Sequence, residues 1–176
     1  RYPGKISTLI ERISFTGFAL PGITVALALV FIGVNVLPIF YQSLGMLIFA
    51  YMVLFLPVAV GPVKSSLLRI NPRIEESGSA LGEHPVKVLW LITFPLVRPG
   101  LLAGSSLVFL VTMKELPATL ILSPIGLSTL ATKTWGAASE AFFAQAAAPS
   151  LLLVFVSLLV MVSVVLPSQR ERWTGV

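Results

Sequence analysis

The residues best placed to do chemistry lie in one apolar string, VTMKELPATLIL, at positions 111–122. Within it Lys114 and Glu115 are adjacent, and Pro117 follows two residues after Glu115. Ionisable side chains inside a bilayer are costly, and those that occur usually face a bundle interior or a watery path. Since adjacent helical residues point about 100° apart, we expect Lys114 and Glu115 to contact different helices. The alternative is snorkelling of both charged ends to the outer interface.

No other set of residues supports catalysis or metal binding. His84 is the sole histidine, there is no cysteine, and every acidic residue is a glutamate. Glu83 beside His84 supplies too few ligands for a metal, and the serines lack the histidine and acid of a nucleophilic site. The nucleotide-binding pattern G-x-x-x-x-G-K-[ST] does not occur in the sequence. We therefore predict a protein that is not an enzyme and uses no metal or cofactor.

The elements that position these residues are predicted to be membrane spans. Hydrophobic residues make up 56% of the chain and charged residues 11%, with a mean hydropathy of +0.97. A soluble domain carries about 25% charged residues, so this composition suits lipid. Residues 13–63 contain no charge, which leaves room for two helices of about 20 residues each. The predicted spans lie at about 14–34, 40–61, 100–122 and 149–167.

Lysines and arginines between the spans predict the orientation, because cytoplasmic loops carry an excess of both. One side of the predicted arrangement holds the basic residues Arg1, Lys5, Arg12, Lys64, Arg69, Arg73, Lys87, Arg98, Arg170 and Arg172. The opposite side holds only Lys133. The predicted fold is therefore an all-α polytopic membrane helix bundle, in which the loop 63–98 and both ends of the chain are cytoplasmic.

The cytoplasmic loop contains a charged segment at 73–99, RIEESGSALGEHPVKVLWLITFPLVRP, punctuated by glycine and proline. We predict a short helix over residues 73–82, ended by Gly82 and by Pro85 shortly beyond it. Small residues at 77–80 leave room for a partner to approach closely, and the neighbouring glutamates offer anionic contacts. The segment is therefore predicted to be a docking surface for a soluble protein.

The spacing in this loop resembles a motif of bacterial ABC importer permeases, written E-A-A, three residues, G, nine residues, I-x-L-P. The matching residues are Glu76, Ser77, Gly78, Gly82, Ile92 and Pro95. Serine and glycine replace the two alanines, and phenylalanine replaces the leucine, which preserves the small and apolar character. The resemblance covers essentially the whole chain and implies the C-terminal part of a permease transmembrane domain, with these residues in an ATPase-coupling loop.

That resemblance implies an inner-membrane permease with three kinds of protein partner. They are an ATP-binding cassette ATPase subunit that receives the coupling helix, a periplasmic substrate-binding protein, and a second permease half or subunit. Fused halves and a homodimer both stay open. The sequence begins at Arg1 without an initiator methionine, so we interpret it as part of a longer polypeptide. No nucleic-acid partner is expected, because the basic residues border apolar runs.

The string KELPATL at 114–120 resembles the permeases of bacterial ferric-iron importers. On this resemblance we expect a translocation path or gate at Lys114, Glu115, Pro117 and Thr119. A carboxylate suits a cationic substrate. Related permeases for thiamine, phosphonate, polyamine or oxyanion share the architecture and remain alternatives. An ion-gradient-driven secondary transporter is a further alternative, although the sequence contains none of the internal repeats that such proteins typically carry.

Overall fold

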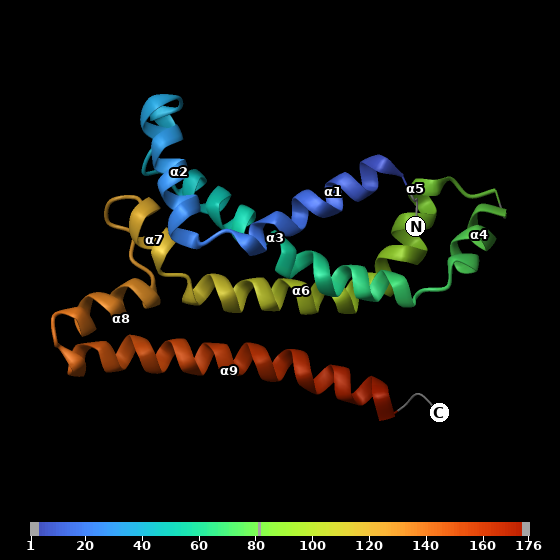
Figure 1. Cartoon of the computed structure of the whole chain (residues 1–176). Helices are drawn as coiled ribbons and strands as arrows, with labels where there is room; N and C mark the ends of the chain where they lie inside the picture. Colours follow the sequence, from blue (N-terminus) through green and yellow to red (C-terminus); the bar gives the residue numbers. More distant parts are fainter. Residues whose placement is uncertain (1–3, 81, 174–176) are drawn as a thin grey trace. The chain divides into compact units, whose positions relative to one another are not determined.

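The computed structural model describes residues 4–80 and 82–173, and every regular element in those residues is helical (Figure 1). Arg1, counted above among the basic residues, lies outside the described part. Three helical runs are long and apolar enough to cross a bilayer: Leu44–Arg69, Pro85–Lys114 and Phe143–Ser163. The shortest has 21 residues and rises about 31 Å, close to the thickness of a hydrocarbon core. The all-α polytopic fold is therefore confirmed.

The helices fall into two compact units, one of residues 58–108 and the other of residues up to Pro57 and from Phe109 onward. The long helices are α3 (Leu44–Arg69), α6 (Phe94–Lys114) and α9 (Phe143–Trp173). The shorter elements are α1 (Lys5–Thr16), η1 (Gly17–Ala19), α2 (Gly22–Asn35), η2 (Pro38–Phe40), α4 (Pro72–Ala80), α5 (Pro85–Val88), η3 (Leu89–Thr93), α7 (Pro117–Leu122) and α8 (Leu130–Ser139).

The helix predicted over residues 14–34 is interrupted at Leu20 and Pro21. The segments Thr8–Ala19 and Gly22–Asn35 meet there at an angle of 106°. Proline lacks a backbone N–H and disfavours a helical conformation in the residue before it. Leu20 is accordingly extended, with φ −97° and ψ 123°. Pro21 therefore ends η1 and starts α2, so this stretch consists of two helical pieces.

A single apolar core holds α2, the first half of α3 and α7 together. Ala26, Ala50 and Ala118 are fully buried, and their short side chains let the helices approach closely. Further buried members are Val25, Leu29, Met46, Leu47, Leu54 and Leu122. This core positions α7, the element that follows the Lys114–Glu115 pair.

A close helix crossing in the same unit depends on Gly17 and Pro57. A Cβ on Gly17 would overlap the carbonyl oxygen of Val53 in α3 and lie 3.2 Å from the Val53 carbonyl carbon. In a regular α-helix the carbonyl of Val53 accepts from residue 57, but Pro57 has no N–H to donate. The small surface of Gly17 therefore covers a carbonyl that lacks its usual donor, at a distance that only a glycine permits.

The predicted span 100–122 differs from the observed helix at both ends. The helical run begins at Pro85, so much of the predicted loop 63–98 is helical, and it ends at Lys114. It ends there because Pro117 cannot donate within a continuing helix and instead takes the first position of α7. The unit 58–108 is packed through glycine in α6, since a Cβ on Gly104 would lie 2.9 Å from the carbonyl oxygen of Ala59.

After α7 the chain forms the pair α8 and α9, which lie side by side (orange and red in Figure 1). Thr129 and Thr132 cap the start of α8 reciprocally, with backbone-to-hydroxyl distances of 2.8 and 3.2 Å. Ala141, at φ 61°, lies in the short connection where the chain reverses. Large apolar side chains along α9 are exposed, including Leu151 at 69%. In a bilayer such a surface faces lipid or further helices.

Candidate functional site

The loop predicted as a docking surface contains the short helix α4. The side-chain oxygen of Asn71 accepts a hydrogen bond of 3.1 Å from the backbone N–H of Arg73, and Pro72 occupies the first helical position. Both are common features of a helix start. α4 ends at Ala80, and Gly82 follows at φ +83°, a conformation that glycine adopts without strain. The sequence thus encodes both ends of this helix.

Two contacts fasten α4 to the helical run that follows it. A Cβ on the buried Gly78 would lie 2.9 Å from Cδ1 of Ile92 and 3.2 Å from Cγ2 of Val88. The hydroxyl of Thr93, which is 6% exposed, donates a 2.7 Å hydrogen bond to Oε1 of Glu75. Hydrogen bonds to an ionised group are stronger than neutral ones. The small size of Gly78 is therefore needed for packing within the chain, and the prediction that it leaves room for a partner is wrong.

The exposed residues of this loop combine charge with apolar surface. Glu76 and Ser77 are exposed on α4, and Pro95 is exposed at the start of α6. The π-helical turn η3 adds Trp90, which is 61% exposed and has its ring centroid 5.1 Å from that of Phe94. A partner surface with an apolar depression and a basic border would complement these side chains.

We predict that Gly78→Val destabilises the loop. The added side chain would meet Val88 and Ile92 at less than van der Waals distance, and overpacking of this kind costs about 1–3 kcal/mol. Faster limited proteolysis between α3 and α6 in the membrane-embedded protein would report the loss. Ser77→Ala, at the exposed neighbouring position, is the matched control. Equal protease resistance of the valine variant and the parent would contradict the packing role.

His84 serves as a helix cap. Its Nδ1 accepts a 3.3 Å hydrogen bond from the backbone N–H of Val86, and Pro85 begins α5. Glu83 pairs with Lys87 across one helical turn at 2.7 Å, with both side chains about half exposed. In the described ranges 4–80 and 82–173 no group of three or more potential metal ligands comes together. The polar residues around His84 therefore shape the start of α5.

At the end of α6, Glu115 lies in the break before α7. Its Oε1 accepts a 3.1 Å hydrogen bond from the backbone N–H of Ala118, and its carbonyl accepts one of 2.7 Å from the hydroxyl of Thr119. Pro117 fills the first position of α7, where a missing N–H leaves nothing unpaired. Lys114 is the last residue of α6 and is exposed. Of the adjacent pair, Glu115 is held by the fold and Lys114 projects from it.

Two residues missed by the sequence analysis complete this junction. A Cβ on Gly22 would lie 2.7 Å from Oε1 of Glu115, and the hydroxyl of Tyr51 is 2.6 Å from Oγ1 of Thr119. Because the single hydroxyl hydrogen of Thr119 goes to the Glu115 carbonyl, Tyr51 is the donor in this contact. Tyr51 carried a usable signal, since a tyrosine amid apolar residues needs a partner for its hydroxyl. For Gly22 the sequence offers no such signal beyond its position directly after Pro21.

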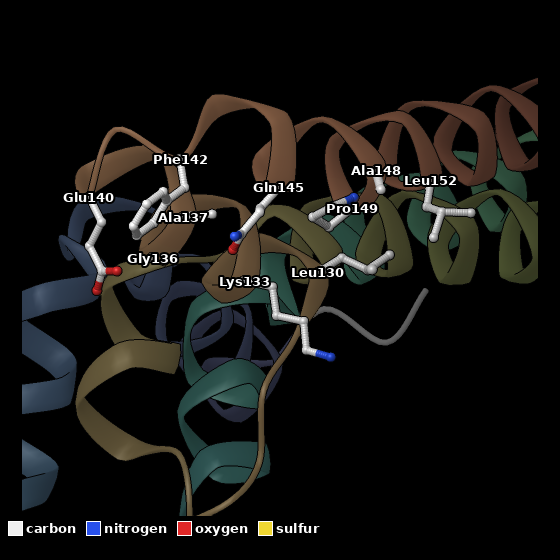
Figure 2. Close-up of a pocket in the computed structure, with 10 residues that line it drawn as sticks. All are labelled: Leu130, Lys133, Gly136, Ala137, Glu140, Phe142, Gln145, Ala148, Pro149 and Leu152. Atoms are coloured by element: carbon white, nitrogen blue, oxygen red, sulfur yellow. The ribbon is translucent and has the colours of Figure 1, made fainter.

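A groove of about 560 Å³ runs between α8 and α9 (Figure 2). It is lined by Leu130, Lys133, Gly136, Ala137, Glu140, Phe142, Gln145, Ala148, Pro149 and Leu152. Lys133 and Glu140 are both exposed, and Figure 2 shows their charged ends pointing apart. The charge pattern assigns Lys133 to the side opposite the basic loop, so the groove belongs to the predicted outer side.

Comparison with known proteins identifies the class of this chain. Residues 1–172 match the profile of the family described as binding-protein-dependent transport system inner membrane component. The chain belongs to this family. The resemblance drawn from the motif spacing at residues 76–95 is therefore confirmed.

Individual relatives carry two kinds of substrate name. The chain is 36% identical over 157 residues to the Fe(3+)-transport system permease protein FbpB 2 of Haemophilus influenzae. The aligned region covers 89% of this chain and 31% of that protein. It is 32% identical over 145 residues to the putative 2-aminoethylphosphonate transport system permease protein PhnU of Salmonella typhimurium. That alignment covers 73% of this chain and 50% of the relative. It is 29% identical to the putative 2-aminoethylphosphonate transport system permease protein PhnV of Salmonella choleraesuis, and that alignment covers 99% of this chain and 65% of the relative. The chain spans less than two thirds of each relative.

Proposed function

We propose that this chain is part of the permease of an ATP-driven importer and forms the translocation path for ferric iron delivered by a periplasmic binding protein. The observation that carries the proposal is the cytoplasmic loop, where the motif spacing coincides with a capped helix ended by Gly82. Membership of the binding-protein-dependent family supports the same conclusion. A second permease half or subunit completes the path.

In this proposal α4 is the coupling helix that docks on the ATPase subunit. Two features support that role: the exposed carboxylate of Glu76, and the attachment of α4 through Gly78 and the Thr93–Glu75 hydrogen bond. A displacement imposed on α4 passes through these contacts to η3 and α6, because packed side chains transmit movement that a loose loop would absorb. The docking surface then includes Ser77 and Pro95. Gly82 and Ile92 hold α4 in position beneath it.

The identity of the substrate rests on the junction between α6 and α7. The KELPATL string, the Glu115 carboxylate and the 36% identity to an iron permease favour ferric iron. The second candidate is a phosphonate, favoured by the exposed cationic Lys114 and by the similarity to PhnU and PhnV. Both substrates fit a path or gate at Lys114, Glu115, Pro117 and Thr119, so only transport measurements separate them.

Uptake of radiolabelled ferric iron and of radiolabelled 2-aminoethylphosphonate tests the substrate. We expect deletion of the gene to abolish ferric-iron uptake and leave phosphonate uptake unchanged, with restoration by the intact permease. Co-purification with an ATPase subunit, and uptake that survives collapse of the ion gradient while ATP is present, separate this importer from a secondary transporter. Loss of phosphonate uptake alone would transfer the assignment to the second candidate.

A further inference from the structure

Four contacts hold the α6–α7 junction in place, and the transport proposal assigns none of them a role. The carboxylate of Glu115 accepts from the backbone of Ala118, its carbonyl accepts from Thr119, and its Oε1 lies against Gly22 of α2. The hydroxyl of Tyr51 in α3 donates to Thr119, whose side chain is fully buried. The same carboxylate therefore caps α7 and contacts α2.

We propose that Glu115 is a latch that holds α7 against α2, and that Gly22 and Tyr51 are the positioning residues that keep the latch closed. The inference rests on the proposed transport function, in which this junction is the gate. In the state described here the carboxylate is occupied by the backbone of α7. Separation of α2 from α7 would uncover the side of the carboxylate that lies against Gly22.

Gly22 is required at its position because of space and charge together. A Cβ would lie 2.7 Å from Oε1 of Glu115 and 3.6 Å from its carboxyl carbon, so alanine pushes the carboxylate away. Gly22 is also the first residue of α2, a helix of 14 residues. The positive end of a helix dipole attracts a carboxylate, and this favours the closed position of Glu115.

Tyr51 acts on the other side of the same segment. Thr119 is 0% exposed, and a buried hydroxyl is stable only with its hydrogen bonds made. The chain of hydroxyls runs from Tyr51 through Thr119 to the carbonyl of Glu115, with distances of 2.6 and 2.7 Å. This chain fixes the backbone at Glu115, which in turn directs its carboxylate toward Ala118 and Gly22.

A cysteine at Val25 reports the separation of α2 from α7. Val25 lies on α2, is 7% exposed and belongs to the core that includes Ala118. The chain contains no cysteine of its own, so the parent protein without Val25→Cys gives the background labelling of the complete permease. The measurement is the rate of labelling of Val25→Cys by a membrane-permeant maleimide, in membranes without substrate or ATP.

We expect Gly22→Ala and Glu115→Leu to accelerate labelling about tenfold, since the first pushes the carboxylate away from α2 and the second removes the carboxylate. Tyr51→Phe gives a smaller acceleration. Glu115→Gln keeps an acceptor oxygen for Ala118 and stays near the parent rate. Gly136→Ala in α8 is the matched glycine control, because its Cβ would meet nothing within 4 Å.

ATP hydrolysis by the assembled importer in the absence of binding protein gives a second readout. Loosening the latch raises this rate, whereas a purely structural defect lowers it together with the yield of protein. Labelling of Gly22→Ala and Glu115→Leu at the parent rate would overturn the proposal. If Gly22→Ala does not accumulate, Glu115→Leu and Tyr51→Phe decide the outcome. The labelling is measured without substrate. A finding that the permease transports something other than iron would therefore change the proposed function but would not alter the labelling result.

Discussion

Replacing Gly17 by alanine is expected to destabilise the protein by about 1–3 kcal/mol, the usual cost of forcing extra atoms into a packed contact. The new methyl group would overlap the Val53 carbonyl oxygen and lie 3.5 Å from the carbonyl oxygen of Leu54. Both neighbours are backbone atoms of α3 and cannot rotate away. Relief therefore requires the helices to move apart, which also uncovers the carbonyl that Pro57 leaves without its usual donor.

The sign of this effect distinguishes it from ordinary helix propensity. Gly61→Ala is the control, because Gly61 lies within the helix α3 and a Cβ there would meet nothing within 4 Å. Alanine in an open helical position is favoured over glycine by up to about 1 kcal/mol. Thermal unfolding in detergent should therefore shift downward for Gly17→Ala and stay level or rise for Gly61→Ala. A matching shift for the two variants would show that the crossing tolerates a methyl group.

Glu76→Lys is expected to abolish coupled transport while leaving the fold intact. Glu76 is exposed on α4, so the substitution costs little within the chain and reverses the charge offered to a basic partner surface. Like charges facing each other across an interface cost several kcal/mol. The measurements are co-purification of the ATPase subunit and stimulation of its ATP hydrolysis by loaded binding protein, and we expect both to be lost.

Glu140→Lys provides the control for this charge reversal. It makes the same chemical change at an exposed position in the groove between α8 and α9, on the predicted outer side. ATPase association should be unaffected there, whatever happens to binding-protein contact. Full association of the ATPase with the Glu76→Lys permease would remove α4 from the proposed docking surface.

The parts of the fold that the sequence predicts are those governed by local rules. Uncharged length and hydropathy predict that long apolar helices occur, and the residues Asn71, Pro72 and Gly82 mark the ends of α4. Pro21 separates η1 from α2 by the same kind of rule, because a proline cannot donate within a continuing helix. These features depend on neighbours along the chain, so they are visible without a structure.

Contacts between distant residues were not predictable in the same way. Gly17 and Gly22 resembled any other small residue in a membrane helix, and only the positions of Val53 and Glu115 reveal what each accommodates. The burial of Gly78 depends on how the chain folds at Val88 and Ile92, so the sequence alone indicated a partner surface there and did not reveal the packing within the chain. Hydrophobic periodicity reports which face of a helix is apolar, but it does not report which atoms of another helix lie opposite.

The π-helical turn at Leu89–Thr93 makes the direction of the preceding helices depend on the number of residues in the loop. The backbone N–H of Phe94 bonds to the carbonyl of Leu89, five residues back, so this turn holds one residue more than an α-turn. Removing that residue would restore a regular helix and rotate everything before it by about 100° relative to α6. The helix α4, which precedes the turn, would then face a different side of α6. The nine residues between Gly82 and Ile92 therefore set an angle, and an insertion or deletion there would change the direction in which α4 faces.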